Sequence, residues 1–196
     1  MKPVPFSNDL YIISDAVDIL KKAVEDGATI VQLRDKSGET AAILRKAREM
    51  VAYKRTRPFV FILNDDPALA VEAGADGVHI GQDKATADAR SIVGAEMILG
   101  KTTRNLDQGR QAIKDGVDYI SVGPVYATPT KPGRPAAGLD YVREAARQLD
   151  IPFVAIGGID LSNIDDVLAS GARTIGVVRA WADAPALLRR IRKERG

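Results

Sequence analysis

The feature that most constrains the fold of this chain is one short unit that occurs four times. Residues 25–33 (EDGATIVQL), 72–80 (EAGADGVHI), 114–122 (KDGVDYISV) and 169–177 (ASGARTIGV) share the same form. In each, the polar end of a helical pattern is followed by a glycine and then by a short, apolar, β-prone run. Glycine suits the left-handed residue that ends many helices, because it has no Cβ to clash. Each stretch therefore predicts a helix, a turn and a strand in succession.

Further apolar runs raise the number of expected strands to eight. These strands begin near residues 10, 29, 59, 76, 97, 118, 152 and 174, and helical patterns such as 39–54 and 106–115 separate them. The runs are almost continuously apolar, as in parallel strands covered on both faces. Strict alternation of strands and helices indicates an α/β fold. Eight strands favour one domain over residues 1–196, a closed (β/α)₈ barrel of the TIM type. A flavodoxin-like open sheet is the alternative, but it leaves three strands unplaced.

The composition excludes several classes of protein. Hydrophobic residues make up 45% of the chain, and 28 basic against 26 acidic residues leave a net charge of only +2. This balance argues against a nucleic-acid or membrane-surface protein. There is no cysteine, and His79 is the only histidine, so disulfides, thiolate catalysis and a multi-histidine metal centre are excluded. No apolar run approaches the roughly 20 residues that cross a bilayer, and the N-terminus lacks an apolar signal core, so we expect a cytoplasmic protein.

Polar side chains follow the expected strands, where a barrel of this type carries its chemistry. After the second strand, Gln32, Arg34 and Lys36 occupy alternate positions and so face the same side. Arginine grips phosphate oxygens with a planar fork, and lysine adds a mobile point charge. We therefore expect an anion to bind beside this strand end.

The third and fourth strand ends carry oxygen ligands and the lone histidine. The third ends in Asn64, Asp65 and Asp66, of which one is expected to cap the next helix. The other two are candidates for a Mg²⁺ site, because this ion prefers hard oxygen ligands. After the fourth strand, His79 and Gly81 face the same side. A lone histidine is more often a hydrogen-bonded core residue than a catalyst, and for His79 both interpretations stay open. Gly81 leaves room for a ligand ring beside the backbone.

The remaining strand ends predict hydroxyl and backbone contacts to phosphate. Thr102 follows the fifth strand, and the loop after the sixth is rich in glycine and proline and contains Thr128, Thr130 and Lys131. Long loops on this face commonly bind or close over substrate. The loops after strands seven and eight form the recurring phosphate site of such barrels, which predicts backbone contacts from Gly157, Gly158, Val178 and Arg179.

Together these motifs resemble those of the thiamine phosphate synthase family. The series VQLRDK, NDD, DGVHIGQD, GPVYATPTK, IGGI and VVRA spans roughly residues 10–181 in the order and spacing of that family. The resemblance implies a transferase that joins 4-amino-2-methyl-5-hydroxymethylpyrimidine pyrophosphate to a thiazole phosphate, with or without a carboxyl group on the thiazole. It also implies a dissociative mechanism with Mg²⁺, in which pyrophosphate leaves first.

The resemblance also implies roles for individual residues. The pyrimidine ring would contact Gln32, His79 and Gly81. The pyrophosphate would be held by Asn64, Thr102 and three catalytic cations, Arg34, Lys36 and Lys131. Magnesium would bind Asp65, with Asp83 as a second ligand. The thiazole phosphate would contact Thr128, Thr130, Gly158 and the backbone of Val178 and Arg179.

Position 84 departs from the family pattern, and three alternatives to the synthase remain. Lys84 stands where the family usually has a second metal-binding carboxylate, which suggests weaker magnesium affinity with Asp83 as a substitute. A thiazole tautomerase of the same superfamily usually has a histidine at the position of Arg104. A non-catalytic regulator of the thiamine pathway and a sugar-phosphate isomerase or aldolase are further options. A Lys131→Ala change separates synthase from regulator, since only a synthase loses its rate. The expected partners are small-molecule substrates, not nucleic acid or membrane, with a homodimer as an option.

Overall fold

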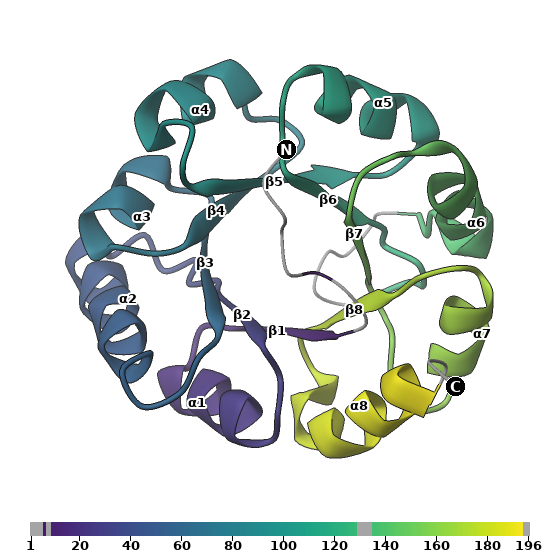
Figure 1. The fold of residues 1–196 in the computed structure, drawn as a ribbon, viewed down its shortest axis with the longest axis horizontal. Helices are drawn as coiled ribbons and strands as arrows, with labels where there is room; N and C mark the ends of the chain where they lie inside the picture. Colours follow the sequence, from purple (N-terminus) through teal and green to yellow (C-terminus); the bar gives the residue numbers. More distant parts are fainter. Residues whose placement is uncertain (1–5, 7–8, 129–134, 194–196) are drawn as a thin grey trace.

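The computed structural model describes residues 6, 9–128 and 135–193, and within these residues it forms one closed barrel (Figure 1). All neighbouring strands are parallel, the strand order around the barrel is the order along the chain, and β8 pairs with β1 to close it. Helices surround the barrel on its outside. The expected (β/α)₈ architecture is thus confirmed, and the alternative of an open flavodoxin-like sheet is wrong.

Each strand begins within one residue of its predicted start. The strands are β1 Leu10–Ser14, β2 Ile30–Leu33, β3 Val60–Asn64, β4 Gly77–Ile80, β5 Ile98–Thr103, β6 Tyr119–Val122, β7 Phe153–Ile156 and β8 Thr174–Val177. The helices are α1 Val17–Glu25, α2 Thr40–Tyr53, α3 Pro67–Ala73, α4 Thr86–Val93, α5 Leu106–Lys114, α6 Gly138–Gln148, α7 Ile164–Ala169 and α8 Ala184–Lys193, with a short 3₁₀ helix, η1, at Ala180–Asp183. The glycine of every repeat has a positive φ, for example 76° at Gly74, as a helix-ending residue requires.

The apolar side chains form two separate layers. One layer lies between the barrel and its helices and takes most of the strand, helix and loop aliphatic residues. The other fills the barrel interior and includes Phe6, Tyr11 and Tyr119, with the rings of Phe6 and Tyr119 packed edge to face at a centroid distance of 4.4 Å. The described part of the barrel interior is therefore a packed core, and a ligand is expected at the carboxyl ends of the strands.

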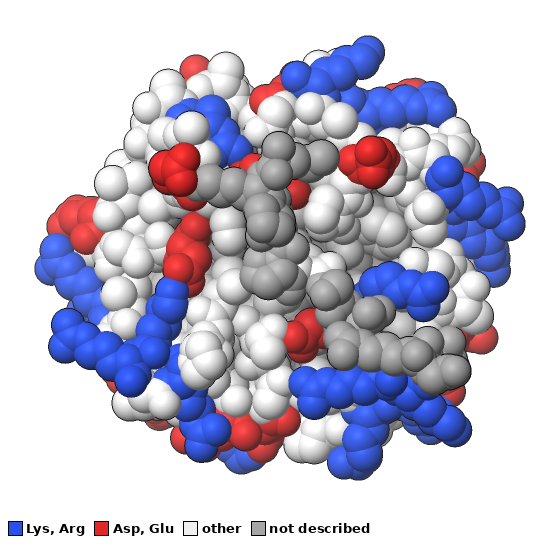
Figure 2. All heavy atoms as spheres, viewed as in Figure 1, with Lys and Arg blue, Asp and Glu red and all other residues white. Residues whose placement is uncertain are grey.

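Charges of both signs are spread over the surface. In the view of Figure 2, lysine and arginine side chains lie mainly around the periphery, with acidic side chains between them. Across the described residues, no helix is both long enough and apolar enough to cross a membrane.

Candidate active site

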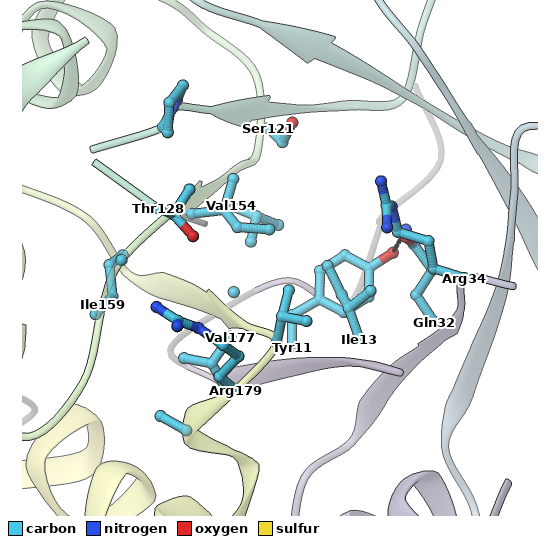
Figure 3. A pocket seen from close by; sticks show the side chains of 18 of the residues that line it. Tyr11, Ile13, Gln32, Arg34, Ser121, Thr128, Val154, Ile159, Val177 and Arg179 are labelled. Atoms are coloured by element: carbon cyan, nitrogen blue, oxygen red, sulfur yellow. Dashed lines mark hydrogen bonds between the residues drawn. The ribbon is translucent and has the colours of Figure 1, made fainter. Parts of the chain in front are cut away.

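A cavity of about 360 Å³ opens at the carboxyl ends of the strands. This volume is in the range of pockets that bind small molecules. Its lining combines polar side chains with the aliphatic Ile13, Val154 and Ile156. Figure 3 shows Gln32 and Arg34 on one side of the cavity, Arg179 on the other, and Tyr11 between them. The cavity therefore offers one surface for a ring and other surfaces for anions.

The floor of the cavity is a set of hydrogen-bonded polar side chains. Gln32 and His79 are only 2% and 7% exposed, and neither faces bulk solvent. Gln32 donates from Nε2 to the hydroxyl of Tyr11 over 2.7 Å. The two ring nitrogens of His79 lie within 3.0 Å of the Tyr119 and Thr102 hydroxyls. Burial raises the pKa of the Tyr11 and Tyr119 hydroxyls well above the ordinary value of a phenol, so both stay protonated.

Three arginines line the upper part of the cavity. Arg34 follows β2, Arg104 follows β5 and Arg179 follows β8. Arginine remains protonated at all ordinary pH values, and these three residues outnumber the two carboxylates of the lining, Asp160 and Asp183, so the charged side chains of the cavity are positive on balance. The cavity is thus suited to ligands that carry phosphate groups.

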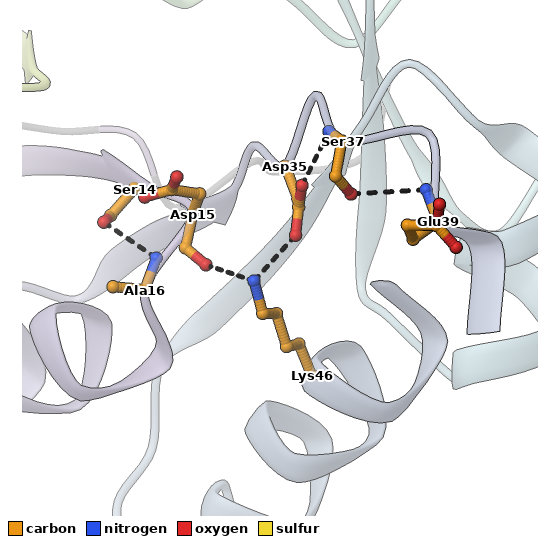
Figure 4. Close-up of polar contacts among 7 residues, drawn as sticks. All are labelled: Ser14, Asp15, Ala16, Asp35, Ser37, Glu39 and Lys46. Carbon is orange, nitrogen blue, oxygen red and sulfur yellow. Dashed lines mark hydrogen bonds and ion pairs between the residues drawn. The ribbon is translucent and has the colours of Figure 1, made fainter. Parts of the chain in front are cut away.

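Asp35, which follows Arg34 directly, does not line the cavity but is bound by a lysine of α2. Lys46 of α2 donates to Asp35 Oδ2 over 2.7 Å and to the carbonyl oxygen of Asp15 over 3.0 Å, as Figure 4 shows. The hydrogen bond from Lys46 is the main cause that lowers the pKa of Asp35 to about 2. The resulting bridge ties the loops after β1 and β2 to α2, and it leaves Arg34 on the cavity side.

The loop after β7 brings bare backbone to the cavity wall. Gly157 and Gly158 have φ values of 109° and 67°, which strongly favour glycine. The loop after β6 packs against them, because Tyr126 N–H donates to the carbonyl oxygen of Gly157 over 2.9 Å. A Cβ at Gly157 would lie 2.5 Å from the Cβ of Pro124. Both glycines line the cavity together with Val178 and Arg179, so the expected phosphate-binding backbone is assembled in one place.

A second polar cluster lies at the margin, outside the cavity lining. Asp65 has a φ of 66°, and among the described residues it is the only non-glycine residue with a positive φ. Burial raises the pKa of its carboxyl group, but the contacts with Lys36, together with those of Asn64 and His79, outweigh burial, so the net pKa is lowered. A Cβ built on Gly81 would lie 2.5 Å from Oδ1 of Asp83 and 3.8 Å from Oδ1 of Asp65. Gly81 therefore leaves a space that two carboxylates border.

The carboxylates of Asp65 and Asp83 are the type of oxygen ligand that magnesium prefers. Asp66 does not compete, because its side chain accepts from Leu69 N–H over 2.9 Å and caps α3, as one residue of this triplet was expected to do. The described residues contain no group of three or more His, Cys, Asp or Glu side chains arranged around a metal. Magnesium commonly binds to one or two carboxylates and takes its other ligands from water and substrate phosphates, so a pair is sufficient.

The structure brings most of the predicted site residues together. The cavity is lined by Gln32, Arg34, Asn64, His79, Thr102, Thr128, Gly157, Gly158, Val178 and Arg179. Lys36, Asp65, Gly81 and Asp83 form the marginal cluster. Thr130 and Lys131 lie outside the described residues. Gly81 is not among the residues that line the cavity, and a Cβ on it would meet Asp83, so its contact with a ligand ring stays a prediction.

Sequence reasoning missed five polar residues of the cavity as ligand contacts: Tyr11, Arg104, Ser121, Asp160 and Asp183. Tyr11 and Ser121 stand inside otherwise apolar strands, and this pattern was a usable signal, because a polar residue in a buried strand needs a partner. Ser121 also lies two residues after Tyr119, so both face the barrel interior.

A closed (β/α)₈ barrel with an arginine-ringed cavity at the carboxyl ends of its strands defines an enzyme that acts on phosphorylated small molecules. The sequence profile of thiamine monophosphate synthase matches residues 7–181. The chain belongs to this family. The match confirms the recognition made from the motifs, and with it a transferase of thiamine biosynthesis.

Individual relatives agree with this assignment. A thiamine-phosphate synthase of Thermus thermophilus is 49% identical over 176 residues, which cover 89% of this chain and 85% of that protein. The enzyme of the same name from Acidothermus cellulolyticus is 47% identical and covers 81% of this chain and 76% of its own. The solved structure of thiamine phosphate pyrophosphorylase from Pyrococcus furiosus superposes with a TM-score of 0.86 at 29% identity, over 97% of this chain and 98% of that one.

Proposed function

We propose that this chain forms thiamine phosphate by a dissociative substitution at the methylene carbon of the pyrimidine pyrophosphate. The single observation that carries this proposal is one cavity of about 360 Å³ that has anion-binding groups on two of its sides. Arg34 lies on one side of the cavity and Arg179 on the other. Asn64 and Thr102 line the cavity from the ends of β3 and β5, and the Gly157–Gly158 backbone follows β7, the neighbour of β8 in the closed barrel. Two phosphorylated substrates can thus bind with their rings in contact.

The proposed roles follow this division. The pyrimidine ring lies over Gln32 and His79. The pyrophosphate is bound by Arg34, Lys36, Asn64, Thr102 and Lys131. The thiazole phosphate is bound by Thr128, Thr130, Gly157, Gly158, Val178 and Arg179. For Thr130 and Lys131 the support is the motif alone.

The chemistry needs cations and positioning more than acids or bases. The C–O bond between the pyrimidine methylene and the pyrophosphate breaks, and its electron pair leaves with the pyrophosphate. The nitrogen of the thiazole then donates its lone pair to the resulting carbocation and forms the C–N bond. Neither step moves a proton. Fixed positive charge on the departing anion and close contact of the two rings supply most of the acceleration.

Asp65 and Asp83 are the residues that would hold a magnesium ion, which when bound supplies further positive charge to the pyrophosphate. Lys36 pairs with Asp65, and Asn64 hydrogen-bonds to it while also lining the cavity. These contacts keep the marginal cluster next to the pyrophosphate side of the cavity. Gly81 contributes the free space between the carboxylates.

The residue Arg104 argues against tautomerase activity. It lines the cavity at the position where tautomerases usually have a histidine. An arginine stays protonated and does not exchange a proton with substrate at neutral pH. It can instead bind a negatively charged group.

A direct assay tests the proposal. Purified protein is given both substrates, with and without Mg²⁺, and thiamine phosphate and pyrophosphate are measured. We expect equal amounts of both products, and a rate at least about a hundredfold lower in Arg34→Gln, because a cation on the leaving group is lost. Arg48→Gln, an exposed arginine of α2 paired with Glu72, is the matched control and should keep the full rate. Absence of coupled product in the unaltered protein would refute the proposal.

Two further expectations belong with this proposal. A homodimer remains a prediction that light scattering on the purified protein tests. A cytoplasmic location also remains a prediction, and it is checked by fractionation of the producing cells.

A further inference from the structure

A chain of hydrogen bonds crosses the cavity floor and joins Gln32 to Thr102 through three buried rings. Gln32 Nε2 donates to Tyr11, and the hydroxyls of Tyr11 and Tyr119 lie 3.0 Å apart. The Tyr119 hydroxyl lies 2.9 Å from Nδ1 of His79, and Nε2 of His79 lies 3.0 Å from Oγ1 of Thr102. The five residues come from five different strands, so this series of hydrogen bonds forms only in the closed barrel.

Close packing holds the middle of this chain in place. Gly100 of β5 pairs with His79 of β4 on one side and with Tyr119 of β6 on the other. A Cβ at Gly100 would overlap the Tyr119 ring and lie 2.6 Å from Nδ1 of His79. The missing side chain at Gly100 therefore lets Tyr119 reach across β5 to the imidazole.

The number of available protons determines which group donates and which accepts in each of these hydrogen bonds. The amide nitrogen of Gln32 can only donate, so Tyr11 accepts there and keeps one proton of its own. If Tyr11 donates to Tyr119, then Tyr119 donates to Nδ1 of His79, and the imidazole carries its proton on Nε2. Thr102 then accepts from His79. In the reverse direction, the buried proton of Tyr11 would have no acceptor among the described residues, which is unfavourable.

We propose that Tyr119 is a positioning residue that holds His79 in the Nε2–H tautomer, and that the Thr102 hydroxyl is thereby free to donate a hydrogen bond to the leaving pyrophosphate. This inference rests on the proposed function, which places the pyrophosphate beside Thr102. Oxygen atoms of an ionised pyrophosphate only accept hydrogen bonds. In the reverse direction Thr102 would donate to His79 and present only lone pairs to the anion. The series of hydrogen bonds thus connects Gln32, beside the pyrimidine ring, to Thr102, which binds the leaving pyrophosphate.

The tautomer can be measured directly because His79 is the only histidine of the chain. Selective ¹⁵N labelling of histidine gives one pair of ring nitrogens, and long-range correlation to the ring protons tells Nδ1 from Nε2. Without substrates, we expect the proton on Nε2, and a proton on Nδ1 would overturn the proposal. This measurement needs no turnover, so an enzyme that fails to form thiamine phosphate refutes the proposed function without affecting the result on the tautomer.

Tyr119→Phe tests the positioning role. It removes the donor to Nδ1, so we expect a mixture of tautomers, a kcat about tenfold lower and a KM for the thiazole phosphate within about twofold of the original. Tyr11→Phe removes the preceding hydrogen bond of the series, between Tyr11 and Tyr119. It replaces Tyr119→Phe as the test if Tyr119→Phe does not fold. A variant that keeps both the original tautomer and the original kcat would contradict the role.

Tyr141→Phe is the matched control. Its hydroxyl is also buried and bonds to Thr103 over 2.6 Å, but it lies on α6 outside the barrel interior. We expect it to lose stability without any change in the His79 tautomer. A change of the tautomer in this variant as well would show that general loosening, and not the chain, explains the effect of Tyr119→Phe.

Discussion

Lys84 shows how one side chain alters the electrostatics of the marginal cluster. It is exposed and follows Asp83 directly, at a position where the family resemblance implies a carboxylate. Its positive charge opposes a divalent cation bound between Asp65 and Asp83. The described geometry leaves the two carboxylates in place, so Lys84 is expected to weaken magnesium binding without abolishing it.

Lys84→Asp should therefore tighten magnesium binding. Exchanging a positive for a negative charge a few ångströms from a divalent ion should lower the half-saturating Mg²⁺ concentration by about tenfold at low salt. The measurement is a titration of the rate with Mg²⁺. Lys193→Asp makes the same charge exchange at an exposed residue of α8 and should leave the titration unchanged. An unchanged half-saturation in Lys84→Asp would place the ion elsewhere.

At the scale of single elements, polar bridges hold the loops that carry the site. Lys46 of α2 ties the first two loops together through Asp35 and Asp15. Lys101 of β5, only 8% exposed, donates to the carbonyl oxygen of Lys84 over 2.6 Å and to Oγ1 of Thr86 over 3.0 Å. Both lysines fix a loop from the neighbouring element, so the barrel's outer layer also determines the geometry of its mouth.

Lys46→Met should destabilise the protein in a pH-dependent way. The pKa of Asp35, held at about 2 mainly by Lys46, returns to about 4 in the unfolded chain. The bridge therefore stabilises the folded state above pH 4 and loses this effect as the pH falls from 4 towards 2. We expect a loss of about 1 kcal/mol in the free energy of unfolding at pH 7, and a smaller loss at pH 3. Urea unfolding at both pH values measures it, and Lys114→Met on exposed α5 should show neither effect.

Lys101→Met should disturb the loop after β4. The change keeps the length of the side chain but removes the donor to the Lys84 carbonyl oxygen, which we expect to lower the free energy of unfolding by about 1–2 kcal/mol. Because this loop carries Asp83, the half-saturating Mg²⁺ concentration should rise as well. Parallel urea unfolding and magnesium titration check the two effects. A loss of stability with an unchanged magnesium response would limit Lys101 to a structural role.

At the scale of the whole molecule, closure of the barrel depends on space as well as on hydrogen bonds. Tyr11 and Tyr119, 108 positions apart in sequence, meet at the centre of the barrel. Phe6 packs against both rings from below the cavity floor. Gly100 is one position where this interior has no volume to spare, because a Cβ there would overlap the Tyr119 ring.

Gly100→Ala should therefore destabilise the whole barrel. Overpacking of a tight core costs about 1–3 kcal/mol, and here the obstacle is a rigid ring, so we expect the upper end of that range. The urea midpoint should fall while the slope of the transition stays unchanged. Gly94→Ala is the control, since nothing lies within 4 Å of its added Cβ and only its φ of 69° opposes the change. Equal losses in both variants would contradict the crowding at Gly100.

The sequence by itself determined the order and limits of the strands, the glycine turns and the presence of polar residues at the strand ends. These features follow from local conformational preference and from the burial pattern of neighbouring residues, which are properties of short segments. The tertiary structure decided which polar residues meet. It placed Lys36 beside Asp65, set Gly81 next to Asp83 and joined Tyr11 to Tyr119, because such contacts depend on the stagger of strands around a closed barrel and on side-chain volume, which no short segment contains.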